Sequence, residues 1–360
     1  MSNQEHRHAM VGKRNPTPPS NRKPGRSPTR TASGARAYLL LLGAGLILCG
    51  LGFVAGLGLL AAARLLPAPP VSGTYCIDEK LAWLKRNPQS FASNLVAVGS
   101  STTWRNLDFS VLSSAARTVL GGVVNAAPCF LRANQTRFMT RYLLEHRPET
   151  HTVLTILSPR DFEACSTSAT SFIEPDLTES YFAGDVPDLW IYFRNLRVES
   201  FIRDVFKLSA RRERELVFDR FGSGPLTTDE PQLRNTFAPE PSCYRELHDL
   251  ATELDDRDVQ LLVVTLPVMP EWANQYDPGG TIRRNFLRNV KAALAETRAL
   301  LIDGQTKYAL PTVAFTDPVH LQWPRVADFT RFIWREARLA GAELPPADLG
   351  RPFTSAIQAR

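Results

Sequence analysis

Residues 259–266 read Val-Gln-Leu-Leu-Val-Val-Thr-Leu, and this is the strongest strand signal in the 360-residue chain. Its apolar side chains follow one another with little interruption instead of alternating with polar ones. Such a run is typical of a strand that is buried on both faces, as in a parallel sheet covered by helices. We therefore expect residues 259–266 to form an interior strand of a parallel sheet.

Shorter apolar runs of the same kind lie on both sides of this strand in the sequence. They are Leu95–Val98, Gly122–Asn125, His151–Leu157 and Leu300–Ile302. Segments with helical spacing of apolar residues separate or follow them. These are Phe109–Arg117, Ala133–Glu145, Ile282–Thr297 and Trp323–Ala340. The alternation predicts an α/β fold in three layers, α/β/α, whose ligands bind beyond the carboxyl ends of the strands.

Residues 166–240 interrupt this alternation, since they are rich in aromatic residues and arginine and contain no clear strand signal. Within them, Leu189–Arg214 is expected to be helical. We interpret residues 166–240 as an insertion in the α/β domain of residues 92–345. Two roles remain open for it: a lid or partner surface, or a plain structural elaboration.

An uncharged run of 27 residues, Ala37–Ala63, lies between Arg36 and Arg64. About 20 apolar residues are enough for a helix to cross the hydrocarbon core of a bilayer. The apolar part of a cleaved signal peptide is only about 7–15 residues long. The length therefore predicts an uncleaved transmembrane helix over residues 37–64, although the small residues Ala61–Ala63 keep a signal peptide as the alternative.

The overall charge of +6 would be typical of a nucleic-acid binder, but its distribution argues against that class. Residues 1–36 contain eight Lys and Arg residues and one acid, Glu5, and with Arg64 the first 64 residues reach +8. The rest of the chain therefore carries −2. Basic flanks set membrane orientation, so we expect a disordered cytoplasmic tail (1–36), a single pass through the inner (cytoplasmic) membrane, and a periplasmic body. Residues 65–91 are expected to be a linker and leading helix, and 346–360 a C-terminal tail.

Four cysteines lie beyond the apolar run: Cys76, Cys129, Cys165 and Cys243. An even number of cysteines in an oxidising compartment permits two disulfides, with three possible pairings. The chain has no Cys-x-x-Cys motif and no Cys/His spacing typical of a zinc site. We therefore expect neither a metal nor a cofactor.

Candidate catalytic residues lie at two strand ends. Gly99-Ser100-Ser101-Thr102 follows the first strand, where a glycine permits a tight turn and a serine is exposed to ligands. A serine nucleophile needs a base. Of the four histidines beyond the apolar run, three lie in polar turns or a charged helix, whereas His320 lies in the loop FTDPVHLQW, three residues after Asp317. A carboxylate beside a histidine fixes its tautomer; the alternative is an ordinary loop pair that caps the next helix.

The order strand, Gly-x-Ser and C-terminal Asp-x-x-His resembles the SGNH/GDSL hydrolase superfamily over roughly residues 92–340. The N-terminal anchor and the Gly-Ser-Ser turn resemble its periplasmic acetyltransferase-like members, which act on polysaccharides as in alginate O-acetylation, and the D-alanine-transfer proteins of the cell envelope. The resemblance implies a flavodoxin-like sheet of the SGNH type. It also implies that Ser101 is the nucleophile, His320 the base and Asp317 its orienting acid.

The sequence departs from the family where oxyanion donors are expected. The family has a glycine after the second strand and an asparagine after the third, whereas this chain has Asn125-Ala126 and Ser158–Asp161. The Asn125 side chain is the candidate substitute donor.

The expected function is that of a membrane-anchored O-acyl (O-acetyl) transferase or esterase that acts on a cell-envelope or exported polysaccharide. A transferase would require a multi-spanning membrane partner to deliver the acyl group. The alternative is a non-catalytic envelope-assembly or glycan-binding protein on the same fold.

Overall fold

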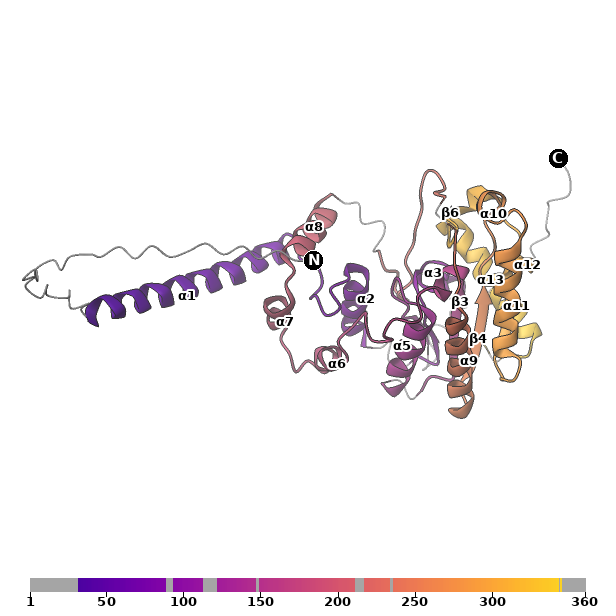
Figure 1. Ribbon diagram of the computed structural model, residues 1–360, viewed down its shortest axis with the longest axis horizontal. Coiled ribbons are helices and arrows are strands. Elements are labelled where there is room, and N and C mark those ends of the chain that lie inside the picture. The colour runs from indigo at the N-terminus through magenta and orange to yellow at the C-terminus, as the bar shows by residue number, and fades with distance from the viewer. Residues whose placement is uncertain are drawn as a thin grey trace, which may run out of the picture. The chain divides into compact units, whose positions relative to one another are not determined.

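Five parallel strands form the central sheet of the computed structural model (Figure 1). They are β1 (Leu95–Ala97), β2 (Val123–Asn125), β3 (Thr152–Leu157), β4 (Gln260–Thr265) and β5 (Leu300–Asp303). All five lie within a residue or two of the predicted runs, and their order is β2-β1-β3-β4-β5. That order is the flavodoxin-like one of doubly wound sheets, and it brings the ends of β1 and β3 together as neighbours. The predicted α/β class is confirmed.

The structure describes residues 32–88, 93–112, 122–146, 149–210, 217–233, 236–342 and 344. Contacts divide the chain into two units, one ending at Gly58 and one beginning at Leu59. Most of the predicted N-terminal tail, and the whole of the predicted C-terminal tail (346–360), lies outside the described residues. So does the second half of the helix predicted over residues 109–117.

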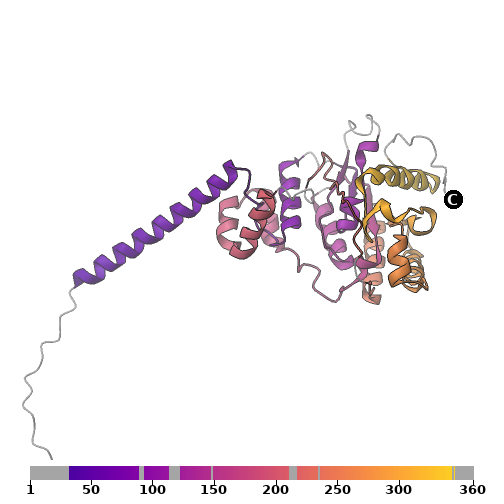
Figure 2. The ribbon, with the colours of Figure 1, turned by 90° about the horizontal axis from the view of Figure 1, so that it is seen from above.

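Two hydrophobic cores lie on opposite faces of the sheet, because successive strand residues point to opposite sides. Val96 belongs to one core and Leu95 to the other. The first core is filled by α2 (Tyr75–Arg86), α5 (Ala133–Glu145), α9 (Pro241–Asp256) and α11 (Thr281–Leu294). The second is filled by the 3-10 turn η2 (Phe109–Val111), α10 (Pro270–Tyr276) and α13 (Trp323–Leu339). Helices therefore cover both faces of the sheet (Figure 2).

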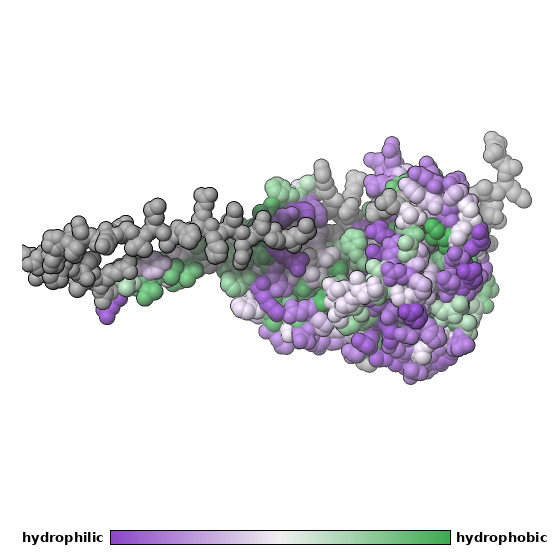
Figure 3. Space-filling view, viewed as in Figure 1, coloured by the Kyte–Doolittle hydropathy of each residue, from purple (hydrophilic) through white to green (hydrophobic). Residues whose placement is uncertain are grey.

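The N-terminal unit contains most of α1 (Ala32–Ala62), and hydrophobic atoms show along this helix where grey atoms do not cover it (Figure 3). Residues Gly34–Ala62 are long and apolar enough to cross a membrane. The predicted apolar segment is therefore one helix, and it is long enough to span a membrane.

The insertion contains three helices and, among its described residues, no strand. They are α6 (Pro175–Ala183), α7 (Asp188–Asn195) and α8 (Val198–Ser209). The single helix predicted over Leu189–Arg214 is wrong, because the chain turns at Leu196 and Arg197. Asn195 ends α7 and uses its side-chain amide to bind the linker at Pro70 O (3.1 Å). Asparagine is a poor helix former, and here its amide serves a tertiary contact instead.

Two disulfides join segments that are distant in the sequence. Cys76–Cys129 links α2 to the loop after β2, and Cys165–Cys243 links the segment after β3 to α9. Of the three pairings that the sequence allows, this is the one formed. The fifth cysteine, Cys49, is free and exposed in α1.

Asp78 of α2 fixes the linker that precedes the helix. Its buried carboxylate accepts a hydrogen bond from the Ser72 backbone N–H (2.5 Å). Burial raises the pKa of Asp78 to about 7 from an ordinary value of 3.8, and repulsion by Glu79 adds to this. The folded protein therefore holds this proton more tightly than the unfolded chain does.

The free energy of unfolding is expected to fall by about 2–4 kcal/mol as the pH rises from about 4 to about 7, because the unfolded carboxyl ionises first. Asp78→Asn should remove most of this decline, while the exposed Asp185→Asn should leave it intact. Melting temperatures of the full chain in detergent, measured by circular dichroism from pH 4 to 8, check this. If the melting temperature changes with pH in the same way in the wild type and in Asp78→Asn, the prediction is wrong.

Candidate active site

A tight turn at the carboxyl end of β1 presents Ser101. Ser101 is the first residue of the short helix α3 (Ser101–Arg105), and its side chain is half-buried. Ser100 caps the helix, with its hydroxyl accepting a hydrogen bond from the Thr102 N–H (3.1 Å). Gly99 is required before the cap because a Cβ there would collide with Thr103 Oγ1. Gly99 and Ser100 thus allow the chain to turn sharply from β1 into α3.

Asp161 holds this turn against the end of β3. One of its carboxylate oxygens accepts a short hydrogen bond from Ser100 Oγ. The other accepts hydrogen bonds from the Ser158 N–H and the Ser158 hydroxyl (both 2.7 Å). Thr103 Oγ1 adds bonds to both backbone groups of Ile156. The serine at position 100 is therefore used for structure, which leaves Ser101 as the hydroxyl that faces outward.

Asp317 and His320 form a buried pair in a β-hairpin. The sequence predicted a loop here, whereas the structure has two short antiparallel strands, β6 (Phe315–Asp317) and β7 (His320–Leu321). Asp317 shapes the turn by accepting from the Val319 N–H (2.9 Å), and its second oxygen lies 2.9 Å from His320 Nδ1. A carboxylate only accepts hydrogen bonds, so Nδ1 carries the proton and Nε2 is the basic nitrogen.

His320 Nε2 is buried and has no hydrogen-bond partner among the residues that the structure describes. A buried polar atom without a partner costs free energy in a folded protein. Such a cost is tolerated where the atom is kept available for a ligand or a reaction. The orphan atom is the one that a general base would use.

Ser101, Asp317 and His320 line the same cavity, of about 690 Å³. The sequence predicted these three residues as one constellation, and the fold brings them to one cavity from opposite ends of the domain. The structure contains no hydrogen bond from Ser101 to His320 Nε2. Nucleophile–base bonds are often loose before substrate binds.

Asn106 ties the two halves of this constellation together, and it was not singled out from the sequence. The residue is fully buried, and its amide nitrogen donates to Thr102 O in α3 (2.7 Å) and to Val319 O (2.9 Å). Its oxygen accepts from the Leu321 N–H (2.8 Å). Both neighbours of His320 are thus held to the Ser101 helix by one side chain. Only the proximity of Asn106 to the Gly-Ser-Ser turn could have drawn attention to it.

The cavity wall carries four basic side chains. They are Arg105, Arg160, Arg203 and Lys207. Arg105 lies over the Trp104 ring at 4.1 Å, and Lys207 pairs with Asp204, which also lines the cavity (3.2 Å). With Asp317 already bonded to His320, the cavity has an excess of positive charge. Developing negative charge on a substrate is favoured there.

Asn125 does not reach the cavity, so its predicted role as an oxyanion donor finds no support in the geometry. It is fully buried and is not among the cavity-lining residues. Its side-chain N–H groups donate to Trp104 O (3.0 Å) and Ser223 Oγ (3.3 Å), and its oxygen accepts from the Ala127 N–H (3.2 Å). These bonds use the amide to support the wall behind Trp104.

Lys80 completes that wall from α2. Its ammonium is fully buried and donates to Asn125 O (2.9 Å) and Gly222 O (2.6 Å). It lies 5.2 Å from the centre of the Trp104 ring, and burial lowers its pKa well below the usual value. A buried amine with two carbonyl acceptors acts as a structural cross-link, and it fixes Trp104 at the cavity.

Within the described ranges, no group of three or more His, Cys, Asp or Glu side chains is arranged to hold a metal ion. No protein-family model matches the chain, and a comparison with curated proteins finds no match.

Proposed function

We propose that the protein is a membrane-anchored serine acyltransferase or esterase of the SGNH type, with Ser101, His320 and Asp317 as its catalytic triad. The observation that carries the proposal is the Asp317–His320 pair at 2.9 Å, with an unpartnered Nε2, in the cavity that Ser101 also lines. Asp317 fixes the tautomer and stabilises the imidazolium as it forms. An ordinary loop pair would not need a buried orphan nitrogen.

The reaction proceeds in two proton-balanced steps. Ser101 Oγ attacks the acyl carbon of an ester while His320 Nε2 takes the hydroxyl proton. The tetrahedral intermediate collapses, and the leaving oxygen takes that proton from Nε2. In the second step an acceptor hydroxyl, or water, gives its proton to Nε2 and attacks the acyl-serine. Ser101 Oγ then leaves and recovers the proton from Nε2.

Stabilisation of the oxyanion is assigned to groups other than Asn125. At the start of α3 the N–H groups of Thr102, Thr103 and Trp104 all donate to Ser100. The backbone donor assigned to the oxyanion is therefore the N–H of Ser101 itself. Arg105 and Arg160 add positive charge to the same cavity. Preorganised donors and charges of this kind usually contribute the largest part of catalysis in acyl transfer.

The proposed cellular setting is supported by α1 and the two disulfides. Disulfides persist in oxidising compartments, which supports a periplasmic body. The basic residues near the start of the chain support a cytoplasmic N-terminus and a single pass through the inner membrane. The acceptor is a cell-envelope or exported polysaccharide, with no role for nucleic acid. A transferase would receive its acyl group from a multi-spanning membrane partner.

One observation favours a second candidate, a non-catalytic glycan-binding or envelope-assembly protein on the same fold. The side chain expected to replace the family's oxyanion donors, Asn125, is bonded within the wall instead. Loss of one such donor costs about 10²–10³ in rate. A cavity of this charge could then bind an acceptor without turning it over.

Acyl capture separates the two candidates. The full chain, purified in detergent, is mixed with p-nitrophenyl acetate, quenched with acid and digested. We expect the peptide containing Ser101 to gain the mass of one acetyl group, and the peptide containing the exposed Ser110 to gain none. His320→Gln should abolish the modification. An unmodified Ser101 peptide in the wild type would contradict the catalytic proposal and favour the binding protein.

A further inference from the structure

Helices α7 and α8 expose a row of large apolar side chains, here called the α7–α8 face. It consists of Leu189, Trp190, Val198, Ile202 and Phe206. Trp190 is 52% exposed and Phe206 is 67% exposed. Val198, Ile202 and Phe206 are spaced four residues apart and so lie on one side of α8. Hydrophobic atoms show at the surface near α8 in Figure 3. Several large apolar side chains exposed on two consecutive helices are typical of an interaction site.

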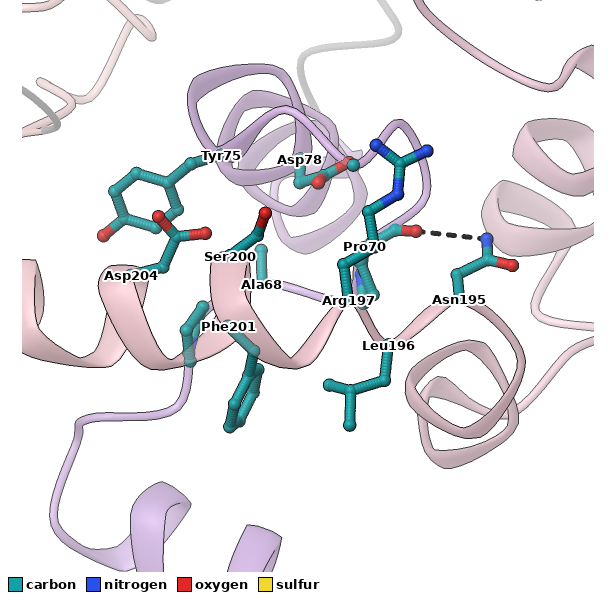
Figure 4. A pocket seen from close by; sticks show the side chains of 12 residues that line it. Ala68, Pro70, Tyr75, Asp78, Asn195, Leu196, Arg197, Ser200, Phe201 and Asp204 are labelled. Atoms are coloured by element: carbon teal, nitrogen blue, oxygen red, sulfur yellow. Dashed lines mark hydrogen bonds between the residues drawn. The ribbon is translucent and has the colours of Figure 1, made fainter.

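The opposite side of α8 belongs to the candidate active site. Ser200, Arg203, Asp204 and Lys207 of this helix line the cavity that contains Ser101. Figure 4 shows Ser200 and Asp204 directed toward α2, where Tyr75 and Asp78 lie. One helix therefore separates the cavity from the α7–α8 face. A helix with its side chains is only about 10–12 Å across.

Hydrogen bonds fasten α7 to the linker that follows the apolar helix. Tyr192 Oη donates a short hydrogen bond to Pro67 O, and the Asn195 amide donates to Pro70 O at 3.1 Å (Figure 4). Pro67 is the fifth residue after Ala62, where α1 ends. Five extended residues span at most about 18 Å. Once α1 is in a bilayer, the chain cannot carry α7 far from the lipid surface.

We propose that the α7–α8 face lies in the interfacial layer of the membrane, with phospholipid as its occupant. Its composition fits this setting, since it carries Trp, Phe, Leu, Ile and Val, and two exposed arginines, Arg194 and Arg197, lie between its α7 and α8 residues in the sequence. Amphipathic helices of this kind enter the boundary between headgroups and acyl chains by about 5–10 Å. The cavity then lies one helix diameter from the lipid, within reach of an acyl donor that arrives through the membrane.

Trp190 serves as a built-in depth reporter for the test. The other five tryptophans are buried or, in the case of Trp323, half-buried. The full chain is reconstituted into phosphatidylcholine–phosphatidylglycerol vesicles with plain or brominated acyl chains. The Trp190 emission is the difference between the wild type and Trp190→Phe. We expect bromine to reduce this emission about twofold, as for an interfacial side chain.

Ile202→Glu/Phe206→Glu should abolish the loss of emission, because it places two charges on the face. Leu339→Glu, at another exposed helical position, should not change it. Each variant is compared with its own Trp190→Phe counterpart. Equal emission in plain and brominated vesicles would overturn the proposal, and it is the result expected if a second copy or a protein partner covers the face.

The inference rests on the proposed insertion of α1 but not on chemistry at Ser101. Flotation of the vesicles after an alkaline wash reports the insertion separately. A chain that floats without quenching refutes only the lipid-bound face. A wild-type chain that does not float refutes the anchor, and the lipid-bound face with it.

Discussion

Replacing Ser101 with alanine is expected to lower the turnover of an activated acyl ester by about 10³- to 10⁶-fold. In the proposed triad the Ser101 hydroxyl forms the covalent intermediate, with His320 Nε2 as its base. Any remaining rate would come from substrate binding and from the positive charge of the cavity. Release of p-nitrophenol by the full chain in detergent measures the effect.

Two further variants test the triad as a unit. Asp317→Asn should lower the rate by about 10⁴-fold, because an amide cannot hold the His320 tautomer in place. Combining it with Ser101→Ala should cost little more than Ser101→Ala alone, since residues of one triad are not additive. Ser110→Ala, at an exposed serine nine positions along the chain, is the matched control. A Ser101→Ala chain with at least half of the wild-type rate would refute the nucleophile assignment.

Removal of the Cys165–Cys243 disulfide is expected to have the largest effect on stability. The two cysteines are 78 residues apart, and both are buried. Loop closure over that length restricts the unfolded chain by about 4.5 kcal/mol in the chain-entropy view. Cys165→Ala/Cys243→Ala should therefore lose about 2–5 kcal/mol of unfolding free energy. The bond also anchors the start of the insertion to α9, so its loss loosens the base of α6–α8.

Urea unfolding of the full chain in detergent, followed by tryptophan fluorescence without reductant, measures this loss. Cys49→Ala is the matched control, because Cys49 is free and lies in α1, outside the α/β unit. The Cys49→Ala variant should unfold at the same urea concentration as the wild type. If the double variant unfolds at the same urea concentration as the control, the disulfide does not stabilise the folded domain.

The sheet could be predicted from sequence because its strands are buried on both faces. Burial of that kind needs continuous apolar runs such as residues 260–265, and few other structures produce them. Helices α5 and α13 were predictable for a similar reason, because each buries one apolar stripe whose helical spacing can be read from the sequence. These signals are local, and tertiary contacts reinforce them.

Features that depend on tertiary contacts could not be predicted. The break between α7 and α8 occurs where Asn195 binds the linker, and the hairpin at Asp317 depends on a side chain that closes its own turn. The disulfide pairing followed from the fold and not from spacing. The role of Asn106 required knowing that residues 213 positions apart, Asn106 and Val319, would meet.

The reactive residues of the candidate site could be predicted from the sequence, but the residues that hold them in place could not. Ser101, Asp317 and His320 have chemistry that is recognisable from residue type and position. The Asn125 amide is chemically just as suitable as an oxyanion donor, but in the fold it donates to Trp104 O and Ser223 Oγ instead. Whether a polar side chain faces a cavity or the wall behind it depends on packing, which a single sequence does not encode locally.

The Cys76–Cys129 disulfide makes the segment that carries Ser101 part of a covalent ring. A protease that cuts the backbone once between residues 76 and 129 would leave both fragments joined through sulfur. When the cut falls between residues 101 and 129, the N-terminal fragment with Ser101 would remain attached through the disulfide to the fragment with His320. Release of Ser101 from His320 after a cut in this segment would also require a reductant, so the bond protects the candidate site against cleavage between residues 101 and 129.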